Sequence, residues 1–471
     1  MGRPREEIDE LVKQGSLAKW SEVADVPTQP RPRMVLPLGV EPSKPRLFWD
    51  DRYLNLMCTH MPFAMDSVGK VAQCSWFGAH QVTLDHKSGF HHVALDAESW
   101  QYFGLCWQGV YYVFTVLGFG WCSSPYIYHT LSSVVGQYLR ARDTPVLVWI
   151  DDFYLSNFRS TKSGTPQAQF RAAQAATYLA LSVFYKAGYF MSASKCVLTP
   201  TTRLVFLGVV CDTTLRRFEV PQDKLDKLEQ ILNGVVETGS IYFATFEKLA
   251  GKCTSMSVAV PPAALYTHFM YKKIGEFRRK GGFITNTEIT VSRNSGLRSE
   301  VDKWLEVRHR MNGAPWYRAA HHVISLNGAT DASSGGWGGL VRGPESVVFE
   351  AAGDFPDEWS SCHINVQEAY ALLETLNLFC AARPLQLAGS KVVIDVDNKT
   401  LYYAFRRGKA KESRMHDIIV QLFWLQVDAD FTLELRWVCS EENKEADDLS
   451  RPGAEHYAGL ESKLFGQLWQ T

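Results

Sequence analysis

The order of apolar and polar residues predicts a mixed region of helices and strands over about residues 46–215. Short apolar runs, which predict strands, lie at residues 82–85, 111–117 and 204–211. Longer periodic segments predict two helices, 125–141 with Pro125 in its first turn and 166–189. Upstream, residues 6–20 predict a short amphipathic helix, and the proline-rich residues 21–45 predict an extended segment. Short strands that alternate with helices are typical of an α+β fold.

The pattern changes twice in the second half of the chain. Residues 221–312 are less apolar and predict mainly helix, and a sequence with glycine and proline at 312–315 follows them. From His321 the predicted elements are strand 321–331, a glycine-rich turn, strand 346–352, helix 365–382, strand 391–397, helix 414–428 and strand 432–438. This order predicts a compact mixed α/β domain. The predicted parts of the chain are 1–40, 41–240, 241–315, 316–455 and a C-terminal tail, 456–471.

Composition limits the class of protein. A chain of 471 residues suffices for two to four domains, and 46% hydrophobic with 21% charged residues excludes a disordered chain. The net charge of −1 argues mildly against nucleic-acid binding, where a basic surplus is expected. One local cluster is basic, and it can either bind phosphates or form a solvated helix face. Its residues are Lys272, Lys273, Arg278, Arg279 and Lys280.

The cysteines and the chain start predict the compartment. Ten cysteines occur without a C-x-x-C pair, which indicates reduced thiols rather than a disulfide or zinc framework. The first residues lack an apolar signal core, and no stretch reaches the length of a membrane span. We therefore expect a cytoplasmic or nuclear protein without membrane contact.

Acidic residues stand at the ends of two predicted strands. Asp85 ends one strand, and Asp151 with Asp152 lies at the tip of a predicted hairpin over residues 146–156. Adjacent like charges repel, so such a hairpin indicates a divalent metal, although a solvated turn is the alternative because Asp is a good turn residue. If the two strands are neighbours, three carboxylates can hold two Mg²⁺ ions roughly 4 Å apart, the arrangement for in-line nucleotidyl transfer.

Six motifs in order resemble those of retroelement reverse transcriptases. They are residues 44–55, 84–93, 114–125, 149–152, 194–196 and 205–208. The resemblance implies a right-hand polymerase, with fingers and palm over 41–240 and a thumb and connection over 241–315. Two residues depart from the family: Trp149 stands where Tyr is usual, and Gly118 where Pro is usual. Neither change removes a metal ligand, so they bear on rate or fidelity.

The resemblance implies a role for each matching residue. Asp85, Asp151 and Asp152 would be the catalytic carboxylates that hold the metal, and Trp149 would support the primer strand. Further residues would act on the incoming nucleotide or the template. Arg46 would pair with the triphosphate, and Phe90 would block a ribose 2′-OH and so select deoxynucleotides. Phe119 and Gly120 would line the pocket, and Lys195 would lie near the triphosphate as a proton donor. Judged alone, Phe90 and Phe119 suit core positions equally well, and Lys195 suits the surface.

A second acidic set lies in the last predicted domain. Its members are Asp331, Glu368, Asp397 and Asp447. Four carboxylates on one sheet and its flanking helices can build another two-metal site, this time for hydrolysis, whereas each residue alone suits a helix cap or the surface. The set resembles that of an RNase H domain, and the family's motifs favour Asp397 over Asp395 and Asp447 over Asp448. The His that many RNases H carry is absent between Trp437 and Asn443, which predicts slower product release.

Together, the motifs resemble a reverse transcriptase followed by RNase H, over residues 44–452. Residues 363–368 and 446–451 look most like those of DIRS-type (tyrosine-recombinase) retrotransposons. The resemblance implies an RNA template, a DNA primer, dNTPs and an RNA–DNA hybrid as partners, and Mg²⁺, which Mn²⁺ can replace, as cofactor. The alternative is a domesticated relative that binds nucleic acid in a ribonucleoprotein with weak or no catalysis. The complete set of seven carboxylates favours the enzyme, because clustered negative charge is costly to keep.

Overall fold

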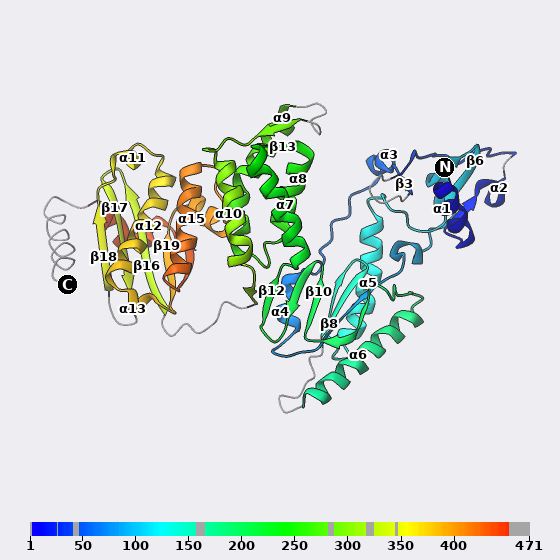
Figure 1. The fold of residues 1–471 in the computed structure, drawn as a ribbon, viewed down its shortest axis with the longest axis horizontal. Helices are drawn as coiled ribbons and strands as arrows, with labels where there is room; N and C mark the ends of the chain where they lie inside the picture. The colour runs from blue at the N-terminus through cyan, green and yellow to red at the C-terminus, as the bar shows by residue number, and fades with distance from the viewer. Residues whose placement is uncertain are drawn as a thin grey trace. The chain divides into compact units, whose positions relative to one another are not determined.

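The chain folds into two compact units, which divide after Glu219. Figure 1 draws the ribbon of this computed structural model with its helices and strands labelled. The described residues are 2–25, 27–40, 47–156, 165–280, 287–316, 325–343 and 347–451. Among them, no helix combines the length and the apolar character that crossing a membrane requires.

The first unit begins with a small sheet and three short helices. Its strands, all antiparallel to their neighbours, are β1 (Leu17–Lys19), β5 (Gly104–Trp107) and β6 (Val110–Phe114), with β2 (Leu38–Val40) paired to β3 (Leu47–Trp49). The helices are α1 (Gly2–Lys13), α2 (Trp20–Val23) and α3 (Arg52–Leu56). The helix predicted over 6–20 ends early, because Gly15 turns the chain with a φ of +74° and Leu17 then pairs with Phe114.

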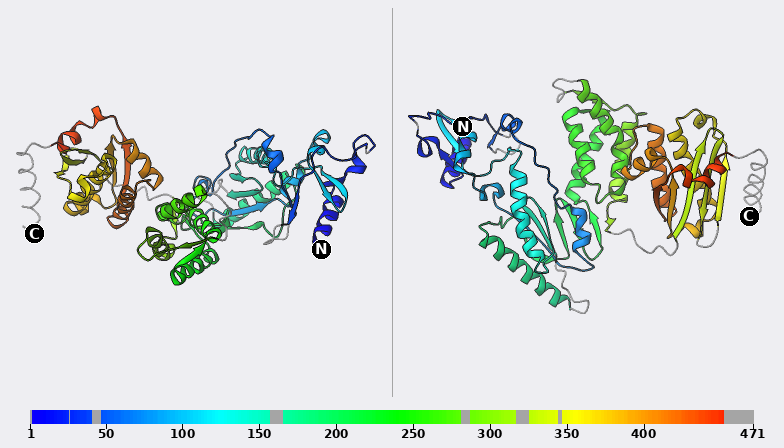
Figure 2. Two further views of the ribbon diagram at one scale, coloured as in Figure 1. Left: turned by 90° about the horizontal axis from the view of Figure 1, so that it is seen from above. Right: turned by 180° about the vertical axis from the view of Figure 1, so that it is seen from behind.

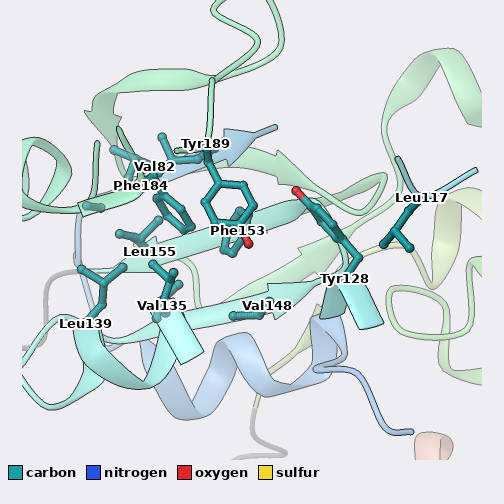
Figure 3. Packing of buried hydrophobic residues seen from close by; sticks show 13 residues of the cluster. Val82, Leu117, Tyr128, Val135, Leu139, Val148, Phe153, Leu155, Phe184 and Tyr189 are labelled. Carbon is teal, nitrogen blue, oxygen red and sulfur yellow. The ribbon is translucent and has the colours of Figure 1, made fainter. Parts of the chain in front are cut away.

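The central sheet of the first unit has the strand order β7-β8-β4-β9, and every pair is antiparallel. Its strands are β4 (Gln81–Asp85), β7 (Val146–Trp149), β8 (Asp152–Ser156) and β9 (Val197–Thr201). Alternate residues of a strand point to one face, so Val82, Val148 and Phe153 share a core. Helices α5 (Ser124–Arg140) and α6 (Pro166–Lys186) cover this face, and Figure 3 shows their side chains packed on it.

One predicted strand of this unit is two strands. Residues 204–211 fall in β10 (Arg203–Phe206) and β11 (Val209–Asp212), and β12 (Arg217–Glu219) follows. Leu207 and Gly208 both have positive φ, 46° and 77°, which matches the twist of a two-residue hairpin turn. The remaining short elements are η1 (Val68–Lys70), α4 (Val71–Cys74), η2 (Gly89–His92) and η3 (Ala97–Tyr102).

The second unit starts with the helical stretch that the sequence predicts. Its elements are α7 (Gln222–Thr238), β13 (Ser240–Tyr242), α8 (Phe243–Ser255), η4 (Pro261–Thr267), α9 (His268–Lys280), β14 (Glu288–Thr290), α10 (Gly296–Arg310) and β15 (Ala314–Pro315). Trp304 of α10 is fully buried and donates to the carbonyl of Tyr266 at 2.8 Å. Glu300 accepts from the backbone N–H groups of Phe269 and Met270 at 2.7 and 2.9 Å, which satisfies the start of α9.

A five-stranded sheet with helices on both faces completes the second unit, and Figure 2 shows it from two further sides. The strand order is β18-β17-β16-β19-β20, from β16 (Ser325–Ser333), β17 (Gly336–Arg342), β18 (Val347–Gly353), β19 (Lys391–Val396) and β20 (Thr432–Trp437). The helices are α11 (Asp357–Ser360), α12 (Ile364–Ala382), α13 (Pro384–Leu387), α14 (Lys399–Arg407), α15 (Ser413–Asp428) and α16 (Lys444–Ser450), with η5 (Ser440–Glu442).

The segment predicted as a glycine-rich turn contains the whole of β17. Its glycines allow helices to approach both faces of the sheet: a Cβ at Gly339 would lie 2.1 Å from Thr375 Oγ1 of α12, and one at Gly338 would lie 2.6 Å from the backbone of Leu449 in α16. Helices α14 and α16 were also absent from the predicted elements, because each is short and follows directly on a strand or turn.

Gly339→Ala should destabilise the second unit by roughly 1–3 kcal/mol, because the added methyl group overlaps Thr375 in a packed helix–sheet contact. Gly234→Ala in α7 is the matched control, since no atom lies within 4 Å of a Cβ there and helix propensity should stabilise it by up to about 1 kcal/mol. Denaturant unfolding midpoints measure both effects. An unchanged midpoint for Gly339→Ala would contradict the close packing of α12 on β17.

Candidate active sites

The first acidic group lies at the tip of the hairpin formed by β7 and β8. Trp149 and Asp152 are its last paired residues, so Ile150 and Asp151 form a two-residue turn. On the neighbouring strand, Asp85 is the direct cross-strand partner of Asp152. Ile150 has a φ of 55°, a strained conformation for a β-branched residue that depends on its surroundings for support. The three carboxylates thus come from two adjacent strands.

A buried histidine that the sequence interpretation missed supports this turn. The backbone N–H of His86 donates to the carbonyl of Asp151 at 3.1 Å, and its ring is hydrogen-bonded to the hydroxyl of Tyr128. The ring also stacks on Tyr189 with 4.6 Å between centroids, and burial lowers the pKa of His86 to about 3, so it is neutral. The one signal in the sequence was its position directly after Asp85.

The first acidic group is held partly out of water. Burial, followed by the charges of Asp151 and Asp85, raises the pKa of Asp152 to about 6, and burial is also the main cause that raises the pKa of Asp151. The ammonium of Lys195 lies 3.1 and 3.2 Å from the two carboxylate oxygens of Asp85 and opposes both shifts. A cationic ligand would relieve the same repulsion.

Two of the residues expected to contact the nucleotide lie together. The ring of Phe90 is 4.9 Å from that of Phe119, and Phe119 is 49% exposed. Gly120 has a φ of +117°, and its carbonyl accepts from the side chain of Asn55 at 2.9 Å. Arg46 lies outside the described residues.

The unusual Gly118 is explained by its neighbour. A Cβ at this position would lie 2.9 Å from Nε1 of Trp49, a side chain that is only 5% exposed. Proline, which the family usually has there, carries a Cβ, so glycine accompanies the tryptophan for a steric reason.

The second acidic group is tighter. Asp331 in β16, Glu368 one turn into α12 and Asp397 just after β19 each place a carboxylate oxygen within 4.8 Å of the others. Over the described ranges this is the one acidic group that meets that distance; Asp85, Asp151 and Asp152 do not.

Buried carboxylates of the second group repel one another. Burial, then Asp331 and Asp397, raises the pKa of Glu368 to about 9, and its Oε2 is buried without a hydrogen-bond partner. Burial, then the charges of Asp397 and Asp447, raises the pKa of Asp331 to about 6, although a hydrogen bond from Ser450 opposes the shift. A clustered set of hard oxygen donors, one of them unsatisfied, fits a divalent cation such as Mg²⁺.

Residues around the second group orient it. Ser450 donates to Asp331 at 2.8 Å and Ser440 donates to Asp397 at 2.7 Å. Neither serine was predicted; Ser440 lies in the segment where the family's His was sought. Asp395 instead pairs with Arg436 through two contacts of 2.6 Å, so Asp397 is the aspartate of this strand that joins the group.

Asp447 lies beside the tight group rather than in it. Its carboxylate pairs with Arg451 at 2.8 Å and is near enough to raise the pKa of Asp331. The fold therefore brings three of the four predicted carboxylates within 4.8 Å of one another and places the fourth beside Asp331.

The basic cluster of α9 does not form one continuous patch. Lys273 pairs with Glu276 at 3.3 Å and Arg278 with Glu247 at 2.8 Å, while Arg279 donates to the carbonyl of Gly275 at 3.1 Å. Lys272 is exposed, and the side chain of Lys280 lies outside those described. Helical geometry separates neighbours in sequence by about 100° around the axis, which is why a run of basic residues divides over several faces.

Comparison with known families identifies the first of these regions. Residues 41–211 match the family model described as reverse transcriptase (RNA-dependent DNA polymerase). These residues resemble a reverse transcriptase domain. The match includes Asp85, Asp151 and Asp152, so the acidic hairpin lies inside the matched stretch.

Individual proteins to which this chain is similar come from foamy viruses. The Pro-Pol polyprotein of simian foamy virus type 1 is 27% identical over 189 residues, which are 40% of this chain and only 14% of the polyprotein. The foamy viral protease-reverse transcriptase dRH in complex with double-stranded DNA matches with a TM-score of 0.51 and 16% identity, over 92% of this chain and 68% of that one.

A third relative is the foamy viral protease-reverse transcriptase in complex with an RNA/DNA hybrid, with a TM-score of 0.50 and 16% identity. The match covers 91% of this chain and 52% of that one. At such identities the likeness shows the fold alone. This likeness confirms the predicted α+β fold, which is similar to that of the foamy viral protease-reverse transcriptase structures.

Glu368→Gln should change how stability depends on pH. A carboxyl whose pKa is raised by folding contributes stability below its unfolded pKa and loses it as pH rises through the folded value; for Glu368 this window runs from about 4.5 to about 9. In a chelator, the wild-type melting temperature should therefore fall over this window by several degrees more than that of the variant.

Thermal melts at pH 5 and pH 9, with and without Mg²⁺, measure this effect. Addition of Mg²⁺ at pH 9 should raise the wild-type melting temperature more than that of Glu368→Gln. Glu374→Gln, on the same helix outside the cluster, is the control. If the melting temperatures of all three proteins changed with pH in parallel, the raised pKa of Glu368 would be contradicted.

Proposed function

We propose that this chain copies RNA, or DNA, into DNA and cleaves the RNA strand of the resulting hybrid. The observation that carries the proposal is the presence of two separate carboxylate groups, one at a strand-paired hairpin tip inside the reverse transcriptase domain and one on the five-stranded sheet. Formation and hydrolysis of phosphodiester bonds each need such a carboxylate group. Because the two carboxylate groups lie in different units, each would serve one of the two reactions.

Divalent ions would complete both sites. Asp85, Asp151 and Asp152 would hold two Mg²⁺ ions in the first; Asp331, Glu368, Asp397 and Asp447 would hold two in the second, with Mn²⁺ as a substitute. When bound, such ions activate the attacking hydroxyl or water and neutralise charge on the leaving oxygen. The orphaned Oε2 of Glu368 and the raised pKa of Asp152 support this assignment.

In synthesis, the chain's own side chains would position the nucleotide and primer. Phe90 and Phe119 present adjacent rings, which suits a wall against the sugar and base of a dNTP. Lys195 would move from Asp85 toward the triphosphate and hold a proton for the leaving pyrophosphate, and Arg46 would pair with its oxygens. Trp149, next to the turn, would support the primer end.

In hydrolysis, the serine hydroxyls would fix the carboxylates. Ser440 and Ser450 each donate to one of the two aspartates, so the free oxygens keep a defined direction. The RNA template, DNA primer and RNA–DNA hybrid are the proposed partners, in a cytoplasmic or nuclear setting. We further propose a DIRS-type origin, which rests on the motifs at 363–368 and 446–451.

The second candidate is a nucleic-acid-binding protein with weak or no catalysis. The net charge of −1, Trp149 in the hairpin motif and the absence of His near Asp447 favour it. Against it, buried Glu368 and Asp331 lower stability in the absence of a cation, and a protein without catalysis has no physical reason to keep them.

Asp151→Asn should reduce DNA synthesis by more than a thousandfold in a primer-extension assay with Mg²⁺ and leave hybrid cleavage intact, since an amide cannot replace a carboxylate ligand. Asp331→Asn should do the reverse. Asp395→Asn, which alters a paired aspartate outside the cluster, is the control for both assays. If Asp151→Asn lost both activities while its fold stayed intact, the two sites would not be separate. If the protein shifted the hybrid band in a gel but gave neither primer extension nor cleavage, the second candidate, a nucleic-acid-binding protein without catalysis, would be supported.

Phe90→Val should raise the incorporation of ribonucleotides at least tenfold relative to deoxyribonucleotides. The smaller side chain leaves room for a 2′-OH beside Phe119. Ratios of kcat/KM for an rNTP and its dNTP measure this. Phe63→Val, which changes a ring that packs on Tyr126 and His129 instead, is the control.

A further inference from the structure

A groove of about 1000 Å³ lies in the second unit, and Asp331, Glu368 and Asp397 are not among the described residues that line it. The start of α9, the start of α12, helix α14 and the loop from α14 to α15 form its walls. The groove therefore joins the helical stretch to the RNase H-like domain, and neither part builds it alone.

Aromatic side chains give the groove flat apolar surface. Tyr271 of α9 and Tyr403 of α14 both line it and are 42% and 50% exposed. Val366, Ala404 and Met415 add apolar lining. Exposed rings of this kind suit a ligand with planar faces.

The charged residues of the groove are mainly basic. Lys272, Arg407, Lys409 and Lys411 line it, and Arg407 also lies 5.8 Å from the ring of Tyr403. Among the described lining residues, Glu412 is the one carboxylate, and it is engaged as a helix cap that accepts from Met415 N–H at 2.6 Å. The groove therefore favours an anionic ligand.

One end of the groove adjoins the second acidic group. Asn365 lines it and accepts from the side chain of Asn398 at 2.9 Å, and Asn398 directly follows Asp397. Asn365 is also three residues before Glu368 on α12, so its side chain lies on the same helical face. A polymer that reaches the carboxylates can therefore continue into the groove.

We propose that this groove binds single-stranded nucleic acid that extends from the hybrid, with unpaired bases stacked on Tyr271 and Tyr403 and phosphates on the four basic side chains. A duplex hides its base faces, so it would use the charges but not the rings, whereas a single strand uses both. This inference rests on the proposed function, which supplies the hybrid and the direction of its strands: a primer whose 3′ end lies at Asp151 presents its 5′ end away from that site.

Fluorescence anisotropy of the full chain in a chelator tests the proposal. The probes are a blunt RNA–DNA hybrid and the same hybrid with its DNA strand extended by roughly eight nucleotides at the 5′ end, within the site sizes typical of single-strand grooves. The extension should raise affinity about tenfold, the effect of roughly one good stacking contact.

Variants of the groove should remove this gain. Tyr271→Ala and Tyr403→Ala should each reduce it at least threefold, while the phenylalanine variants keep it because they keep the ring. Lys409→Glu and Lys411→Glu should reduce the gain in affinity from the extension and make that gain depend less on salt. Tyr178→Ala on α6, which is 75% exposed, and Lys227→Glu on α7 are the matched controls.

The proposal would be overturned if the extension gave no gain in affinity, or if the control variants lost the gain equally. Full competition by polyglutamate would also overturn it, because it would mark an unspecific anion site.

Primer extension and cleavage of the blunt hybrid are measured on the same variants. If both activities fail in wild-type protein while the extension still binds through the tyrosines, the proposed function is wrong and the groove stands. If both activities persist while the tyrosine variants bind the extension normally, only the groove is wrong.

Discussion

Carboxylate groups held closer together than their charges favour are the constraint on which this structure depends. Each group is placed on a rigid frame that stops it from spreading. In the first unit the frame is the pairing of β4 with β8, which sets Asp85 opposite Asp152, and in the second it is the junction of a sheet with α12. Burial, followed by the charges of neighbouring carboxylates, raises the pKa of Asp152 to about 6 and that of Glu368 to about 9. Folding therefore keeps these carboxylates partly desolvated and close to like charges, at a local cost in stability once they are ionised.

The residues around the two carboxylate groups hold them in position in different ways. At the hairpin tip, Ile150 has a strained backbone. The backbone N–H of His86 donates to the carbonyl of Asp151, while its buried ring contacts Tyr128 and Tyr189. On the five-stranded sheet, glycines in β17 let α12 and α16 approach from opposite faces. In both units, close packing of neighbouring residues fixes the positions of the carboxylate oxygens. Larger side chains at these packed positions would therefore be poorly tolerated.

Sequence reasoning recovered much of this because the strongest signals were local. Asp151 and Asp152 between two apolar runs predict a hairpin tip, and Asp85, which ends another predicted strand, is the cross-strand neighbour of Asp152. Position alone could not reveal His86, since its function lies in contacts with Tyr128 and Tyr189, which are far away in the chain. Strand β17 was hidden because its glycines have no side chain to show alternation, and Ser440 and Ser450 gave no signal beyond their nearness to aspartates.

The sequence by itself determined the α+β class, the order of the six motifs and which carboxylates could act, because these depend on residue type and on periodicities of a few residues. The tertiary structure decided which of them meet. It brought Asp331, Glu368 and Asp397 within 4.8 Å, paired Asp395 away with Arg436, and divided the basic run of α9 over several faces. Distances between residues that are remote in sequence follow from how helices pack on a sheet, and that packing is a collective property of the whole core rather than of any one segment.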